Sequence, residues 1–203
     1  MGMVNHAAVM ARLVLIPGYV TEFKKVFPGS NSLTIDNVAK AIASYERTLI
    51  TPNSPYDRYV NGDTGAISAQ AIRGMATANA VGCIQCHSGA NFNESGGMET
   101  FPKYTDNEYV AKYKFLEDVG NGQHKFRVQT WRNITQTAPY FHNGAVATLP
   151  EAVRVMAKTQ LDTDLDDQQV ADIVEFMKTL SGEFPEQTMP RLPETPGETV
   201  VEN

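Results

Sequence analysis

The chain has 203 residues, with 17 basic and 23 acidic side chains and a formal net charge of −6 at pH 7. This acidic balance argues against nucleic-acid binding, because phosphate contacts need clustered Lys and Arg, and it suits a cationic partner instead. No apolar run reaches the roughly 18 residues of a membrane-spanning helix. The opening residues lack the pattern of a signal peptide, so none is predicted within this chain.

Helix start and stop signals recur along the chain, while alternating strand-like runs are nearly absent, so an all-α fold is predicted. Asn5 is expected to cap a helix over about residues 6–15. Thr34 is expected to cap another over about 35–50, which Pro52 ends. The apolar stripe of this second helix consists of Val38, Ala41, Ile42, Tyr45 and Leu49.

The middle of the chain combines a short helix with a long polar stretch. Ser68 is expected to open a helix that runs into the chain's two cysteines. Residues 88–130 contain glycine breakers at 96, 97, 120 and 122 and are predicted to form a loop region. Because long loops are uncommon in compact domains, this one is expected to wrap around something.

Two further helices are predicted before the C-terminal tail. Thr148-Leu-Pro-Glu151 has the spacing of a capping box and should open a helix that runs to about Lys158. Asp166 and Gln169 have the same spacing and should open an amphipathic helix that stops near Ser181. The proline-containing residues 183–203 are expected to lie extended along a surface.

Both cysteines of the chain lie in the sequence Cys83-Ile-Gln-Cys86-His87, which matches the C-x-x-C-H attachment motif of c-type haem. Two thioether bonds need thiols about one helical turn apart, and the adjacent histidine then supplies the proximal iron ligand. The competing interpretations are a thioredoxin-like redox pair and half of a zinc site. The first needs a βαβ context and the second needs two further ligands, and the sequence offers neither.

The sixth iron ligand decides whether the iron mainly carries electrons or reacts with small molecules. Met156 is the favoured candidate, because the chain can return to the opposite haem face after the wrapping loop. Met98 is the second choice. Met75 and Met177 are interpreted as core residues of their helices. The remaining candidate is Met189.

Two aromatic side chains are possible neighbours of the haem. His142 lies in the stretch TAPYFHNG, where it is either a hydrogen-bonded structural histidine or part of the haem surroundings. Trp131, the single tryptophan, is either a core residue or a haem-adjacent aromatic. His6 and His124 are expected to be solvated.

Four stretches together resemble the bacterial di-haem cytochrome c peroxidase family, which includes the methylamine-utilisation maturases. They are DNVAKAIASYERTLITPNSPYDRYVNGD, GCIQCHSG, FRVQTWRNITQTAPYFHNGAVATLPEAVRVMAKTQL and QQVADIVEFMKTLSGEFP. The resemblance covers nearly the whole chain and is with the C-terminal, electron-transfer haem half of that family. It implies a cytochrome c-like haem domain with an N-terminal helical segment and an extended C-terminal tail.

The resemblance also implies roles for individual residues. Cys83 and Cys86 would form the thioethers of one covalent haem c, and His87 and Met156 would be its axial ligands. Methionine at 156 is similar to the peroxidases, since the maturases have tyrosine there. The family binds calcium through backbone carbonyls that would correspond to Thr137 and Pro139, with the remaining protein ligand from the N-terminal domain.

The chain departs from the family in having one C-x-x-C-H motif where the family has two. Residues 1–50 are expected to be a helical segment of an otherwise missing N-terminal haem domain, and 51–182 to be the electron-transfer domain. An orphaned apolar face is therefore expected on 1–50, covered by another chain or by a haem domain missing through truncation or a misplaced gene start. A homodimer and a periplasmic location are further expectations.

The main hypothesis is transfer of electrons from a small donor cytochrome or cupredoxin to a peroxidatic haem that reduces hydrogen peroxide to water. This chain alone would then only transfer electrons. The rival is a stand-alone electron carrier or a haem subunit of a larger complex without peroxidase activity. A third hypothesis, peroxidase activity at this haem itself, requires Met156 to leave the iron.

Overall fold

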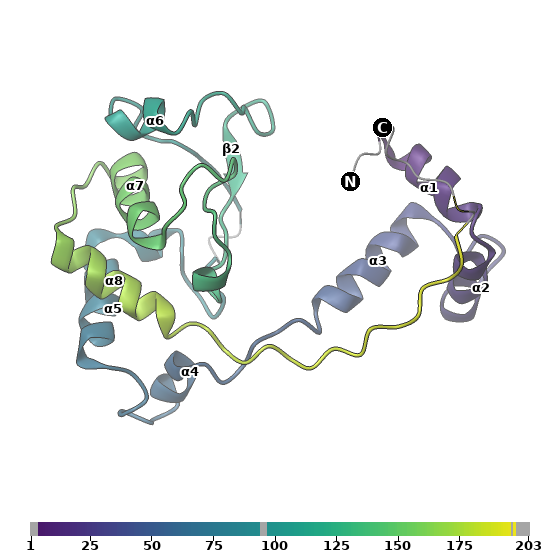
Figure 1. Cartoon of the computed structure of the whole chain (residues 1–203), viewed down its shortest axis with the longest axis horizontal. Helices are drawn as coiled ribbons and strands as arrows, with labels where there is room; N and C mark the ends of the chain where they lie inside the picture. The colour runs from purple at the N-terminus through teal and green to yellow at the C-terminus, as the bar shows by residue number, and fades with distance from the viewer. Residues whose placement is uncertain (1–3, 94–96, 196, 198–203) are drawn as a thin grey trace. The chain divides into compact units, whose positions relative to one another are not determined.

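A computed structural model describes residues 4–93, 97–195 and 197, and within them the chain is mostly helical, which confirms the predicted fold class (Figure 1). Eight α-helices, two short 3-10 turns and one two-stranded sheet are present in these ranges. The chain divides into two compact units, one of residues 1–50 with 184–203 and one of residues 51–183. Among the described helices, none has the length and hydrophobicity that a membrane crossing requires.

The first unit contains α1 (His6–Val14), α2 (Pro17–Val26) and α3 (Ile35–Glu46). The side chain of Asn5 caps α1 by accepting from the backbone N–H of Ala8 at 2.9 Å, as predicted. Thr34 caps α3 in the same way, but α3 ends at Glu46, four residues before the predicted end. Helix α2 was not predicted. Its first residue is a proline, whose fixed φ suits the first turn of a helix even though it would break an interior turn.

The three helices of this unit are at most partly covered on their apolar sides. No residue of α1, α2 or α3, all of which are described, is buried. The small core of the unit is formed between helices, at Ile16 and Leu33. Residues 183–195 form neither helix nor strand, and Pro193 packs so closely on α2 that a Cβ on Gly18 would lie 2.4 Å from its Cβ.

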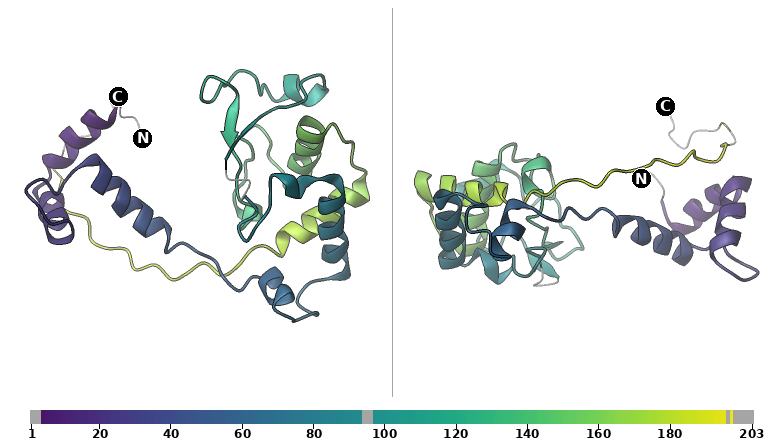
Figure 2. Two further views of the ribbon diagram at one scale, coloured as in Figure 1. Left: turned by 180° about the vertical axis from the view of Figure 1, so that it is seen from behind. Right: turned by 90° about the horizontal axis from the view of Figure 1, so that it is seen from below.

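The second unit contains the remaining helices, of which α5 (Ala69–Val81) and α8 (Asp167–Lys178) form the closest pair. They lie side by side in the views of Figures 1 and 2. A Cβ on Gly74 of α5 would lie 1.8 Å from the backbone oxygen of Asp172 in α8, so the two backbones are in direct contact. Arg73 donates from Nε to the Asp172 carboxylate at 3.1 Å, which ties the same two helices together.

Helix α7 (Leu149–Leu161) follows the loop region and lies beside α8. The predicted capping box at its start is wrong, because the Thr148 side chain makes no cap hydrogen bond. Glu151 instead accepts from the Tyr113 hydroxyl at 2.6 Å and from Lys112 Nζ at 3.1 Å. Helix α7 also runs three residues past the predicted end.

The other predicted caps of this unit are present. Ser68 caps α5, accepting from the Ala71 N–H at 3.0 Å. Asp166 and Gln169 form the reciprocal capping box of α8, with hydrogen bonds of 2.7 and 3.0 Å. Helix α8 ends at Lys178, before the predicted stop at Ser181.

The predicted loop region contains short regular elements. Strands β1 (Met98–Thr100) and β2 (Lys125–Arg127) pair antiparallel with Met98 opposite Arg127, and α6 (Glu108–Lys112) lies between them in sequence. The sheet was not predicted, because three-residue strands are too short to show alternation. Helix α4 (Pro55–Val60), the turn η1 (Cys83–Gln85) and the turn η2 (Ile134–Gln136) complete the unit.

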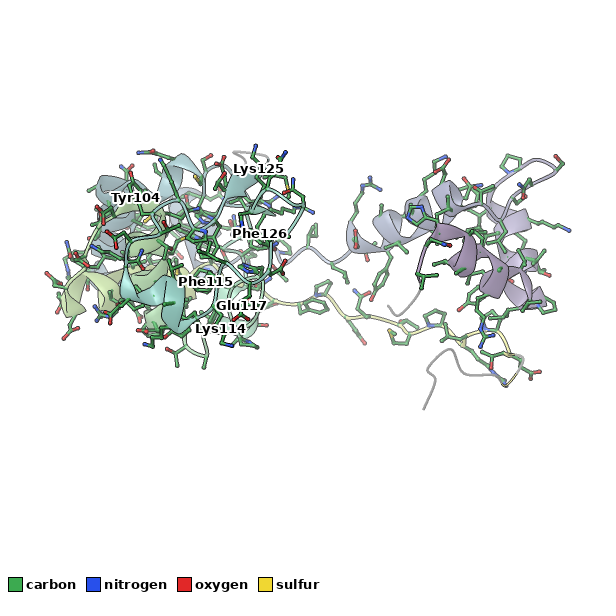
Figure 3. The ribbon with its side chains drawn as sticks, turned by 90° about the horizontal axis from the view of Figure 1, so that it is seen from above. Tyr104, Lys114, Phe115, Glu117, Lys125 and Phe126 are labelled. Atoms are coloured by element: carbon green, nitrogen blue, oxygen red, sulfur yellow. The ribbon has the colours of Figure 1, made fainter. Side chains whose placement is uncertain are left out.

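The main core of the chain lies in this second unit. Phe115, Val155, Ile173, Phe176 and Leu180 are its most buried large side chains. Phe115 comes from the loop region, so that region is packed into the core and does not merely cover it. The side chains of Phe115 and Phe126 are labelled in Figure 3.

Candidate haem site

The cysteine motif follows directly on the end of α5. Gly82 caps α5 with φ of 102°, a conformation that other residues adopt only with strain. The turn η1 follows, and the His87 N–H donates to the Cys83 carbonyl at 3.0 Å. Cys83, Cys86 and His87 therefore lie on one tight turn, and neither cysteine forms a disulfide.

A cavity of about 510 Å³ opens next to this turn. Its walls come from the motif, from residues 126–132, from residues 137–142, and from helices α7 and α8. Cys83, Cys86, His87 and Met156 all line it. The volume falls within the range of about 300–1,000 Å³ that is typical of cofactor sites, and most lining side chains are apolar. The cavity therefore suits a largely apolar cofactor of this size that two thiols and an imidazole could hold.

His87 is held on two sides. Its Nδ1 lies 3.1 Å from the carbonyl oxygen of Phe92, and its ring stacks on Trp131 with centroids 4.6 Å apart. Burial lowers the pKa of His87, against hydrogen bonds with the backbone of Phe92 and Gln129 that raise it. The neutral imidazole is the form that binds iron, and a hydrogen bond at one ring nitrogen leaves the other to serve as the ligand.

Burial also affects the two thiols. It raises the pKa of Cys83 to about 11, and it raises the pKa of Cys86, with further contributions from nearby charges. Burial therefore favours the protonated form of both thiols.

Two of the candidate methionines line the cavity, namely Met156 on α7 and Met177 on α8. Met177 is also part of the core, as predicted, whereas Met156 is only partly buried. Met98 is 48% exposed on β1 and Met189 is 76% exposed in the first unit, and neither lines the cavity. Met75 packs against the core. Met156 therefore lines the same cavity as the cysteine motif, whereas Met98, the second choice, does not.

Trp131 and His142, the two expected neighbours of the haem, both line the cavity. Trp131 is only 6% exposed and belongs to the core as well. The His142 ring stacks on Phe126 at 4.0 Å, and its buried Nε2 has no hydrogen-bond partner among the described residues. The expectation that His124 is solvated holds only in part, because the residue is half-buried and its Nδ1 is likewise buried without a partner in those ranges.

The calcium expectation depends on backbone oxygens alone. Thr137 and Pro139 are exposed and adjoin the turn η2 at the rim of the cavity. Within the described ranges, no group of three or more His, Cys, Asp or Glu side chains is arranged to hold a metal ion. Calcium takes six to eight oxygen ligands, so the two carbonyls alone would not complete a site.

Sequence reasoning missed Arg132, which contacts both the cavity and the loop that carries the His87 partner. Its side chain donates to Ser54, Asp57 and the Ala90 carbonyl. The quoted stretch FRVQTWRNITQ contains Arg132, but nothing in its local pattern shows that its partners lie 42 to 78 residues away.

Comparison with known proteins matches two family models to this chain. The model described as "Di-haem cytochrome c peroxidase" matches residues 1–65, and the model described as "Cytochrome c" matches residues 71–181. The cytochrome c match covers more than half of the chain and contains the cysteine motif and Met156.

Several curated proteins are similar over most of the chain. Cytochrome c551 peroxidase of Nitrosomonas europaea is 39% identical over 189 residues, which cover 91% of this chain and 55% of that protein. Cytochrome c551 peroxidase of Pseudomonas aeruginosa is 39% identical over 187 residues, covering 88% and 53%. The methylamine utilization protein MauG of Methylophilus methylotrophus is 28% identical over 201 residues, covering 93% and 59%.

A solved structure shares the fold. A MauG-like protein associated with microbial copper homeostasis superposes with a TM-score of 0.59 at 24% identity, over 88% of this chain and 63% of that one. The chain spans about half the length of the curated relatives that it matches. The cytochrome c match and the peroxidase relatives indicate covalent haem c as the cofactor. The chain has a cytochrome c domain and belongs to the family of di-haem cytochrome c peroxidases and MauG proteins.

Proposed function

We propose that residues 51–183 form an electron-transfer haem domain. In this proposal Cys83 and Cys86 form the two thioethers, and His87 and Met156 are the axial ligands of one haem c. The observation that carries it is the cavity, which these four side chains line together although Met156 comes from a different helix. Bound haem supplies a one-electron iron couple, which a thioether ligand holds at a raised potential.

The protein's own residues account for the other requirements of an electron carrier. The Phe92 carbonyl orients the His87 ring, and Trp131 packs flat against it. Ile173, Met177 and Val153 contribute apolar walls that exclude water from the cavity. A ligand set that is held in one arrangement changes little between oxidation states, which favours rapid electron transfer.

The full reaction, we propose, is the reduction of hydrogen peroxide to water at a second, peroxidatic haem. Two electrons and two protons convert one hydrogen peroxide into two waters, and this domain would deliver the electrons one at a time from a small cytochrome or cupredoxin. The names of the peroxidase relatives support this proposal. A periplasmic location follows from it, because covalent haem attachment takes place outside the cytoplasm.

The second haem would lie on a polypeptide that covers the apolar side chains of the first unit. Large hydrophobic residues are exposed there on α1, on α2, on α3 and beyond its end, including Val14, Val26, Ile42, Tyr45 and Ile50. Surfaces of this kind are typical of interaction sites.

The proposal extends to a homodimer and to calcium held by the carbonyls of Thr137 and Pro139, which adjoin the cavity.

The second candidate function is a stand-alone electron carrier or a haem subunit without peroxidase activity. The cavity favours it, because the complete C-x-x-C-H motif and Met156 both line it, so one unit holds every proposed ligand of a single haem. Both candidates use the same electron-transfer domain. They differ in whether a second haem receives the electron.

The test is to produce the chain with a haem c maturation system, and then to measure intact mass, haem per chain and the optical spectrum. One covalent haem and a Met-to-ferric charge-transfer band are expected. Met156→Leu should abolish the band, while Met177→Leu, which changes the other cavity methionine, should keep it. Loss of the band in Met177→Leu alone would overturn the assignment of Met156.

Peroxidase turnover separates the two candidate functions. The chain alone should oxidise a reduced donor cytochrome without consuming peroxide. Native protein isolated with two haems and peroxide turnover would support the peroxidase. A single haem on a native chain of this length, with electron exchange but no turnover, would support the carrier.

A further inference from the structure

The side chain of Arg132 joins two separate segments of the haem domain to its own, and it is only 17% exposed. Its Nε donates to the Ala90 carbonyl at 2.9 Å, one terminal nitrogen donates to Ser54 Oγ at 3.0 Å, and the other donates to the Asp57 carboxylate at 2.8 Å. The guanidinium also lies 5.7 Å from the ring centroids of Tyr56 and Phe92.

Ser54 and Asp57, the partners of Arg132 at the start of α4, are themselves held in place by hydrogen bonds. Ser54 is fully buried and caps α4, and its N–H and hydroxyl both donate to the Asp57 carboxylate, at 2.9 and 2.8 Å. The Arg132 charge is paired with the Asp57 carboxylate, so the network is close to neutral. It therefore acts mainly through geometry and less through its electric field.

The third partner of Arg132, the Ala90 carbonyl, belongs to the loop that leads away from the haem motif. Three consecutive carbonyls in this loop each have a partner. The Ala90 carbonyl accepts from Arg132, the Asn91 carbonyl accepts from the Thr130 hydroxyl, and the Phe92 carbonyl faces His87 Nδ1. The Thr130 hydroxyl also accepts from the backbone N–H of Arg132 at 3.0 Å. The two residues that donate to the loop are therefore hydrogen-bonded to each other.

We propose that Arg132 is a positioning residue for the iron ligand. By fixing the backbone of residues 90–92, it holds the Phe92 carbonyl where His87 Nδ1–H can donate to it. This hydrogen bond makes the imidazole a stronger donor to iron and favours the ferric state, so Arg132 sets the reduction potential through His87. The inference depends on the proposed role of His87 as ligand.

Lysine is the informative substitution at this position. Arg132→Lys keeps the positive charge, but the single ammonium group of lysine cannot donate to Ala90, Ser54 and Asp57 together as the planar guanidinium does. Any change in potential therefore comes from geometry and not from charge. Arg73→Lys is the matched control, because Arg73 also forms a two-pronged contact, with Asp172, but does not line the cavity.

The experiment uses the full chain loaded with haem, and it measures two properties that a purely structural role would not move. These are the hydrogen-exchange rate of the His87 Nδ1 proton by NMR and the midpoint potential by redox titration. Arg132→Lys should speed the exchange at least tenfold and raise the potential. Arg73→Lys should leave both near the wild-type values while lowering thermal stability.

Thr130→Val provides a second test that does not depend on Arg132→Lys retaining its haem. It removes the hydroxyl that donates to the Asn91 carbonyl. The exchange rate of the His87 Nδ1 proton and the midpoint potential should both rise, by less than in Arg132→Lys. The inference is overturned if wild type carries haem on His87 while neither loop variant differs from Arg73→Lys. Wild type without covalent haem, or with an unchanged haem spectrum in His87→Ala, would overturn the proposed function as well.

Discussion

The close contact between α5 and α8 at Gly74 gives a sharp prediction, that Gly74→Ala destabilises the haem domain. In an exposed helix this substitution would be favourable, because alanine is the better helix former by about 1 kcal/mol. At Gly74 the new methyl group would lie 1.8 Å from the Asp172 carbonyl oxygen and 2.4 Å from its carbon. Real Cβ contacts are almost never under 3.0 Å, so the helices must separate by about an ångström.

The size of the effect follows from what lies opposite Gly74. The obstructing atoms belong to the backbone of α8 and cannot rotate away as a side chain would. Overpacking of a core costs about 1–3 kcal/mol, and a rigid obstacle places Gly74→Ala at the upper end. Subtracting the gain of about 1 kcal/mol in helix propensity leaves a net loss of about 2 kcal/mol, or about 30-fold in the unfolding equilibrium.

The assay is urea unfolding of the haem-loaded chain, followed by the fluorescence of Trp131, the only tryptophan. The midpoint should fall while the slope with denaturant stays constant. Gly65→Ala is the control, because its Cβ would meet only the Asp63 carboxylate at 3.6 Å, an ordinary contact. It should be neutral or stabilise by up to about 1 kcal/mol. A urea midpoint for Gly74→Ala equal to or above that of the wild type would refute the close approach of α5 and α8.

Three further predictions concern the ligands and the Asp57 ion pair. Cys86→Ala should leave one thioether and reduce haem retention on denaturing gels, and full retention would contradict its attachment role. Met156→His should lower the potential, because imidazole favours ferric iron more than a thioether does, and an unchanged potential would exclude Met156 as ligand. Burial would raise the pKa of Asp57, but hydrogen bonds from Arg132 and Ser54 outweigh it and hold the pKa below 3.8. This stabilisation is present above about pH 3.8 and is lost as the pH falls through the lower folded-state value. The difference in urea midpoint between wild type and Asp57→Asn should therefore narrow at low pH, and a constant difference would show that the pairing contributes nothing.

The elements that could be predicted from sequence are those fixed by neighbouring residues. The caps at Asn5, Ser68 and Asp166 are local hydrogen bonds, and the structure contains each of them. Glu151 does not take part in the predicted capping box, because its carboxylate accepts hydrogen bonds from Tyr113 and Lys112, 38 and 39 residues earlier. A capping pattern describes what a residue can do, and tertiary partners decide whether it does so.

The same distinction applies to the site. The haem motif and Trp131 could be found from sequence because the attachment chemistry has a fixed spacing and the tryptophan is unique. The Arg132 network could not, because Ser54, Asp57 and Ala90 are distant in sequence and each is unremarkable in its own segment. The sequence already favoured Met156 over Met98, and the cavity adds independent support for that prediction, because Met156 lines it and Met98 does not.

The segment 130–133 also explains how the haem domain closes on itself. Asn133, next to Arg132, donates from its amide nitrogen to Thr51 Oγ1 at 2.8 Å and accepts from the Gly182 N–H at 3.2 Å. Thr51 and Gly182 lie near the two ends of this unit, and a Cβ on Gly182 would lie 2.2 Å from the Thr51 oxygen. The ends therefore meet at the segment whose neighbouring residues support His87. Closing the domain and the proposed positioning of His87 thus involve adjacent residues of one segment, Asn133 for the first and Thr130 and Arg132 for the second.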